Sequence, residues 1–125
     1  MMDIDEFLFF DKTPGMLPLY EAVRDTICAE FENVTIKVRK TQISFSNRYG
    51  FAFVSLPYRK LKGRPDEYII FTFGLNHRLE HPRIMEAVEP YPGRWTHHVI
   101  LRSVDDVDAE LKEWITEAYG FSMVK

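Results

Sequence analysis

The sequence predicts an α+β fold, a mostly antiparallel sheet of about five strands with the N- and C-terminal helices packed on one face. Apolar residues recur at helical spacing only near the two ends of the chain, and the middle holds short alternating or continuously apolar segments. No βα unit repeats, which argues against a parallel sheet. With 125 residues, 46% of them hydrophobic, we expect residues 1–125 to form a single domain with a substantial core.

The first long helix is expected from about Pro18 to Glu32. Proline suits the first turn of a helix, and Asn33 can end it. Residues 3–10 are acidic and then apolar, which predicts a short turn or helix that docks on the domain. The apolar stripe of the long helix consists of Leu19, Ala22, Val23, Ile27 and Phe31.

A hairpin over residues 40–56 is expected to organise the sheet. Ile43 and Phe45 alternate with polar residues, residues 47–50 form a turn with Gly50 at positive φ, and residues 51–56 read as a central strand. An earlier strand covers residues 34–38. The alternation of core-facing and outward-facing residues shifts by one position near Arg39 and Lys40. This shift indicates either a β-bulge in one long strand or a two-residue turn.

The second half of the chain predicts two more strands and the final helix. Residues 57–67 form an exposed basic loop, 68–75 a strand, 82–88 a short helix, 90–93 a rigid turn and 95–102 the last strand. Ser103 is the expected N-cap of the final helix, and Gly120 its expected end. The last strand should present one face made of Trp95, His97, Val99 and Leu101.

Charge is segregated along the chain although the net charge is only −3. Residues 1–36 carry a net −6, residues 37–102 a net +7, and residues 103–125 a net −4. The predicted sheet is therefore basic and the helices acidic. No apolar run reaches the length of a membrane span, the N-terminus is too acidic for a signal peptide, and Cys28 has no partner for an internal disulfide. We expect a soluble cytoplasmic protein without a membrane partner and with a packed, inert thiol.

Several segments together resemble the bacterial family called domain of unknown function 5655. The resemblance covers most of the chain from about residue 19, and more distantly the order of elements is similar to the small YjbR-type α+β fold. It implies a twisted antiparallel sheet backed by helices, no assigned activity, and a link to nucleic-acid biology through nuclease-like proteins that carry related domains. The segments are Lys40–Phe45, Phe73–Leu75 with Arg78–Leu79, Pro90–His98, Glu110–Leu111, Trp114–Ile115 and Glu117–Tyr119.

Two groups of histidines are candidates for chemistry. His77, Glu80 and His81 match the H-x-x-E-H pattern of inverted zinc proteases, but Pro82 disfavours a helix there, so we expect no metal. His97 and His98 face opposite sides of a strand, which places His97 in the core and His98 on the open face. There His98 could act as a general base for Ser44. The chain has no glycine-rich phosphate loop or CxxC pair, so no cofactor is expected.

The leading functional hypothesis is a non-catalytic binding module for an anionic partner, with nucleic acid as the candidate. The open sheet face and the basic loops would supply the contacts. The alternatives are an enzyme with a polar pocket around Lys40, Gln42, Ser44 and His98, and a homodimer or structural module that uses the open face. The candidate binding residues are Arg39, Lys40, Gln42, Ser44, Arg48, Arg59, Lys60, Lys62, Arg94 and His98.

Overall fold

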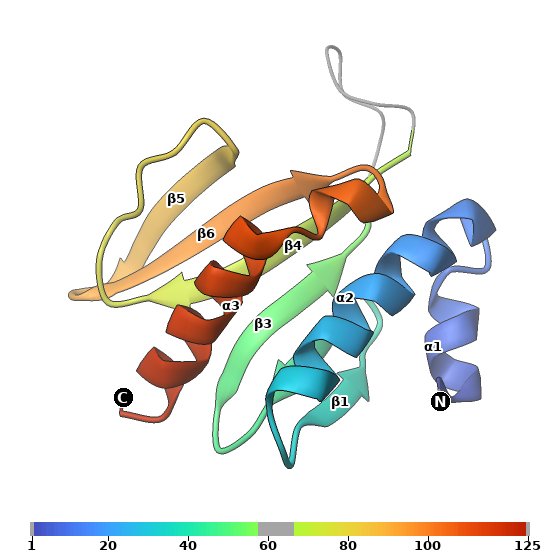
Figure 1. The fold of residues 1–125 in the computed structure, drawn as a ribbon, viewed down its shortest axis with the longest axis horizontal. Helices are drawn as coiled ribbons and strands as arrows, with labels where there is room; N and C mark the ends of the chain where they lie inside the picture. The colour runs from blue at the N-terminus through green and yellow to red at the C-terminus, as the bar shows by residue number, and fades with distance from the viewer. Residues whose placement is uncertain (1, 58–66, 125) are drawn as a thin grey trace.

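The chain folds into a six-stranded antiparallel sheet (Figure 1). Helices precede the strands at the N-terminal end of the chain and follow them at its C-terminal end. The computed structural model describes residues 2–57 and 67–124. The strand order across the sheet is β1-β2-β3-β4-β6-β5. Along the chain the elements are α1 (Ile4–Phe9), the 3₁₀ helix η1 (Pro14–Met16), α2 (Leu17–Glu30), β1 (Thr35–Val38), β2 (Gln42–Ser46), β3 (Gly50–Ser55), β4 (Ile69–Leu75), β5 (Ile84–Tyr91), β6 (Arg94–Leu101), the 3₁₀ helix η2 (Val104–Asp106) and α3 (Ala109–Ser122).

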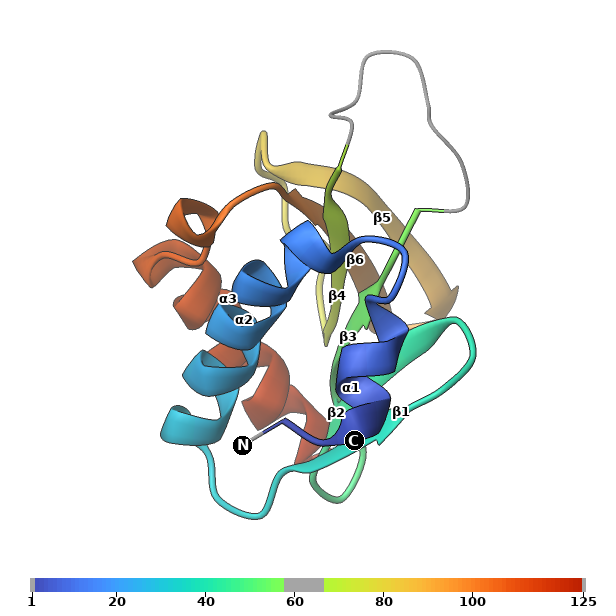
Figure 2. The ribbon, with the colours of Figure 1, turned by 90° about the vertical axis from the view of Figure 1, so that its right-hand side faces the viewer.

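The helices α2 and α3 lie on the same face of the sheet, as the sequence predicts (Figures 1 and 2). Their apolar stripes share one buried cluster with the inward residues of the strands, because antiparallel partners point to the same face. The expected sheet contacts Ile43, Phe45, Val99 and Leu101 are fully buried there. Cys28 is exposed on α2, so the expectation of a packed thiol is wrong. Within residues 2–57 and 67–124, no helix combines the length and apolar character needed to cross a membrane.

The sixth strand replaces a predicted helix. Residues 82–88 were expected to be helical, but β5 covers Ile84–Tyr91 and pairs with β6 along its length. Met85, Glu86 and Ala87 favour a helix locally, yet β6 offers a row of backbone donors and acceptors that β5 satisfies. The tertiary hydrogen bonds therefore outweigh the local preference for a helix. Residues 90 and 91, which were expected to begin a turn over 90–93, are part of β5.

The shift in the alternation of core-facing residues near Arg39 is caused by a turn and not by a bulge. β1 pairs with β2 in antiparallel register, with Val38 opposite Ile43, and the Arg39 N–H donates to the Gln42 carbonyl at 2.8 Å. Of the two alternatives, the reversal of the chain is therefore correct. It places the charged turn residues at one end of the sheet.

Gly50 does not take the positive φ expected of it. Among the described glycines only Gly93 has positive φ, at 75°. Gly50 instead leaves room for a ring, because a Cβ at this position would lie 2.9 Å from Cζ of Phe53. Glycine is favoured at this position because it has no side chain that would clash with the nearby Phe53 ring.

Both long helices end differently from the prediction. α2 stops at Glu30, and Asn33 takes the left-handed conformation with φ 60°. Ser103 caps the 3₁₀ helix η2, whereas α3 has its own N-cap, Asp108, whose side chain accepts from the Leu111 N–H at 3.0 Å. α3 then continues through Gly120 to Ser122, so this glycine does not end the helix.

Candidate anion-binding site

The candidate binding residues fall in three places. Arg39 and Lys40 form the turn between β1 and β2, whereas Arg48, in the next turn, and Arg94, at the start of β6, lie at the opposite end of the strands. Gln42, Ser44 and His98 are on the strands between these ends. Three further candidates, Arg59, Lys60 and Lys62, lie outside the described residues.

A cavity of about 670 Å³ opens at the end of the sheet that carries Arg39 and Lys40. We call it the end cavity. Its polar lining residues come from the β1–β2 turn and the adjoining ends of β2 and β3: Lys40, Thr41, Gln42 and Ser55. Its apolar lining residues come from α1, from the segment after β3 and from β4: Leu8, Phe9, Leu56, Pro57 and Ile70.

Three cations of the β1–β2 hairpin, one of which lines this cavity, have no carboxylate partner among the described residues. Lys37, Arg39 and Lys40 are exposed, and none of them forms an ion pair with a described residue. We call these three residues the basic hairpin. By contrast, Lys112 of α3 pairs with Glu30 of α2 at 3.2 Å. The basic hairpin therefore concentrates three cations without a described carboxylate partner at one end of the sheet, whereas Arg48 and Arg94, which also have no ion pair with a described residue, lie at the other end.

The open face carries a row of side chains in register: Ser44, Phe53, Thr72, His98 and Glu86. Phe53 and Thr72 stand between Ser44 and His98, and the Ser44 hydroxyl donates to the Lys37 carbonyl at 3.4 Å. The Nδ1 atom of His98 lies 2.8 Å from the Thr72 hydroxyl, and its Nε2 atom lies 3.8 Å from the Glu86 carboxylate. His98 thus bonds to Thr72 and not to Ser44. Strand register, which the sequence leaves open, decides this pairing.

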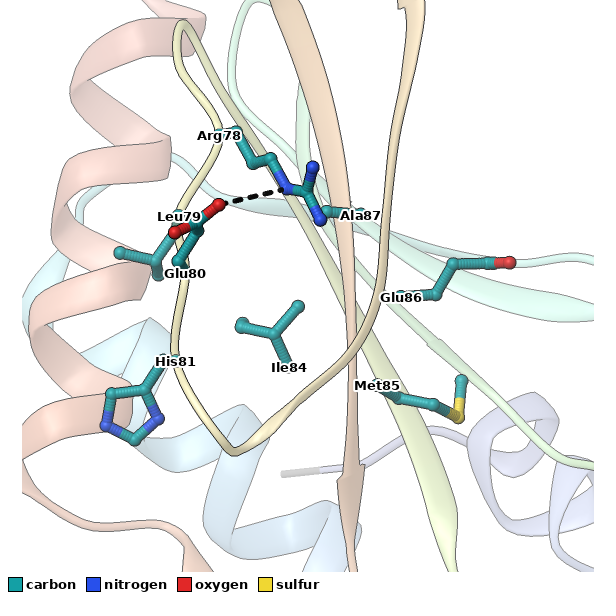
Figure 3. Close-up of a pocket in the computed structure, with 8 residues that line it drawn as sticks. All are labelled: Arg78, Leu79, Glu80, His81, Ile84, Met85, Glu86 and Ala87. Carbon is teal, nitrogen blue, oxygen red and sulfur yellow. Dashed lines mark ion pairs between the residues drawn. The ribbon is translucent and has the colours of Figure 1, made fainter.

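A second hollow, of about 240 Å³, lies between residues 78–81 and the start of β5 (Figure 3). Its cation, Arg78, is 3.9 Å from the Glu80 carboxylate and stands over the Trp95 ring. Glu86 lies on the opposite wall (Figure 3). Because Arg78 is already paired with Glu80, this hollow is a poor site for an anion.

The histidines of the H-x-x-E-H pattern pair separately with α3. His77 lies 2.6 Å from Glu117, and His81 lies 2.9 Å from Glu110. The hydrogen bond to Glu117 raises the pKa of His77. Glu110 and Glu117 are seven residues apart on one helix, which separates them by roughly 10 Å. The described residues contain no group of three side chains arranged to hold a metal ion.

We predict that the purified protein contains no stoichiometric zinc at His77, Glu80 and His81. The two histidines have separate carboxylate partners along α3, so they do not converge on a common point. Elemental analysis of the protein and of a His81→Ala variant checks this. About one zinc per chain, lost in the variant, would contradict the prediction.

His97 is fully buried and stacks on Phe73. Its Nε2 atom accepts a hydrogen bond from the Leu79 N–H at 2.8 Å, so the ring proton resides on Nδ1. Burial lowers the pKa of His97, and the nearby His77 adds to this shift. His97 therefore binds the backbone at Leu79 as a neutral ring, and its burial matches the core position expected for it.

Comparison with known proteins yields one match. A family model described as domain of unknown function (DUF5655) matches residues 8–122. No curated protein and no solved structure is significantly similar to the chain. The distant similarity to the YjbR-type fold stays a prediction.

Proposed function

We propose that this chain, which belongs to the family of domain of unknown function 5655, is a non-catalytic module that binds a polyanion. Nucleic acid is the candidate partner. The observation that carries the proposal is the basic hairpin. Lys37, Arg39 and Lys40 are exposed within four residues of each other, and no described carboxylate neutralises them. Cations of this kind attract phosphate groups and release condensed counterions.

The acidic helices reinforce this orientation. α2 and α3 cover one face of the sheet, and their carboxylates include Glu21, Asp25 and Glu113. A molecule with a basic end and an acidic back turns its basic end toward phosphates, although its net charge is −3. The contacts available are charges and not base-reading groups, so binding should tolerate any sequence.

The enzyme hypothesis has less support. Lys40 and Gln42 line the end cavity, but Ser44 and His98 are not among its lining residues. His98 bonds to Thr72 on the open face, so the four residues proposed for one polar pocket do not share one. A homodimer through the open face stays a prediction.

Binding of labelled single- and double-stranded DNA and RNA tests the proposal. We expect dissociation constants on the order of 10⁻⁵ M at low salt, with steep weakening as salt rises. Arg39→Glu should weaken binding about tenfold, because it replaces an attraction by a repulsion. It should also reduce the slope of log affinity against log salt by about one. Fluorescence anisotropy at several salt concentrations measures both quantities.

Lys112→Glu is the matched control, because it makes the same change of charge on the helical side. It should leave affinity within about twofold of the unmodified protein. Arg48→Glu shows whether the far end of the strands takes part. Absence of binding at low salt, or equal losses from Arg39→Glu and Lys112→Glu, would rule out the basic hairpin as a polyanion site.

A further inference from the structure

We propose that the end cavity binds a small organic anion whose charged head meets Lys40 and whose apolar body lies against α1. This goes beyond polyanion binding, because the ligand is a single small molecule and its contacts include an apolar wall. The two proposals share Lys40 but not Lys37 or Leu8, so they can fail separately.

The polar end of the cavity suits an anionic head. Lys40 supplies a charge that no described carboxylate neutralises. The hydroxyls of Thr41 and Ser55 and the amide of Gln42 add uncharged donors around it. Among the described residues that line the cavity there is no aspartate or glutamate, so this part of the lining does not favour a cation. Carboxylate and phosphate groups both match this set of donors.

The apolar end of the cavity suits an uncharged body. Leu8 is 60% exposed, and Phe9, Leu56 and Ile70 are only partly buried. A ligand chain or ring that covers these side chains removes apolar surface from water, which favours binding. Ile4, with 72% of its surface exposed on the same helix, does not line the cavity and provides an internal comparison.

The end cavity has a suitable volume, and the charge of its lining distinguishes it from other hollows. Its volume of about 670 Å³ lies within the usual range of small-molecule sites, roughly 300–1,000 Å³. Three other hollows in the described chain include carboxylates in their lining, namely Glu80 and Glu86 in the first, Glu30, Glu113 and Glu117 in the second, and Glu32 in the third. An anion would meet repulsion in each of them.

The test uses decanoate as the probe. Acetate serves as a carboxylate without the long alkyl chain, and decanol as an alkyl chain without the negative charge. Titration of the ¹⁵N-labelled protein should shift the amide signals of residues 8–9, 40–42 and 55–57 with decanoate. Acetate and decanol should each bind at least fivefold more weakly, because each lacks one half of the contacts. An aromatic phosphate, 1-naphthyl phosphate, shows whether the site prefers a carboxylate or a phosphate head.

Matched substitutions assign the two ends of the cavity. Lys40→Met should weaken decanoate about fivefold, whereas Lys37→Met, on the same hairpin, should not. Leu8→Asp should weaken it at least as much, whereas Ile4→Asp should not. These positions are exposed, so the variants are expected to fold, and their ¹⁵N spectra verify it.

The same variants separate this inference from the polyanion proposal. Lys37→Met should weaken nucleic-acid binding and spare decanoate, and Leu8→Asp should weaken decanoate more than nucleic acid. The inference is overturned if decanoate shifts none of these signals, if decanol binds as tightly as decanoate, or if Leu8→Asp and Ile4→Asp have equal effects.

Discussion

Replacing Glu6 with alanine is expected to lower the free energy of unfolding by about 3 kcal/mol. Glu6 is 2% exposed, although it lies on the short helix α1. One of its carboxylate oxygens accepts from the Asp3 N–H at 3.1 Å. The other accepts from the Tyr20 hydroxyl and, at 2.8 Å, from Nε of Arg24.

The size of the effect follows from burial of both partners. Tyr20 is fully buried, and burial followed by its hydrogen bond to Glu6 raises the pKa of its phenol far above the usual range. The Arg24 side chain is only 15% exposed. Removing the carboxylate takes the acceptor from a buried hydroxyl and an ion-pair partner from a largely buried guanidinium, and both groups were desolvated on folding.

Two variants serve as controls for Glu6→Ala in urea unfolding followed by tryptophan fluorescence. Asp5→Ala removes an exposed carboxylate from the same helix and should change stability by less than about 0.5 kcal/mol. Tyr20→Phe removes one hydrogen bond but keeps the Glu6–Arg24 pair, and should cost about 1 kcal/mol. Equal stabilities of Glu6→Ala and Asp5→Ala would contradict the role assigned to Glu6.

The Glu6 contacts also matter for the end cavity. They attach α1 to α2, and α1 contributes Leu8 and Phe9 to the cavity wall. A chain that keeps its sheet but loses the docking of α1 would lose two of the five described apolar residues that line the cavity. Decanoate binding should therefore decline in Glu6→Ala even below the urea concentration at which the sheet unfolds.

Acidification from pH 7 to pH 5 is expected to destabilise the protein through His97 by up to about 2 kcal/mol. Burial lowers the pKa of His97 below its value in the unfolded chain, which is about 6.5. The unfolded state therefore binds the proton more readily. The stability contributed by the neutral ring is complete above the unfolded pKa and declines as pH falls below it, at up to about 1.4 kcal/mol per pH unit.

Several groups near His97 also affect its titration or the pH dependence of stability. His77, His98 and Glu117 all influence its titration, and protonation would also break the bond from the Leu79 N–H to Nε2. His77 acts in the opposite direction, because its raised pKa gives stability that is present below about pH 6.5 and lost as pH rises. Since His77 is about half exposed, its contribution is the smaller one.

His97→Gln is the variant that tests this pH dependence. Glutamine offers an oxygen that can accept from the Leu79 N–H and does not titrate. Its free energy of unfolding should change less between pH 7 and pH 5 than that of the unmodified protein, even if it is lower at pH 7. Parallel dependence of the two proteins on pH would show that His97 does not titrate on unfolding.

Much of the fold follows from local patterns. Helical spacing of apolar residues located α2 and α3, and alternation located β1, β2 and β6, because these periods depend only on neighbouring residues. The face of β6 with His97, Val99 and Leu101 inward was predicted for the same reason. The prediction of a helix at 82–88 was wrong because β5 is stabilised by hydrogen bonds to a strand that the local sequence does not reveal.

The sequence by itself determined the α+β class, the two long helices and the separation of basic and acidic segments. Only the tertiary structure decided which of these charges are uncompensated and where a cavity opens. Glu6 and Tyr20 meet across 14 residues, and the end cavity joins residues 8–9, 40–42, 55–57 and 70. Contacts at such separations depend on strand register and on the docking of α1, which arise when the whole core packs and leave no periodic signal in the chain.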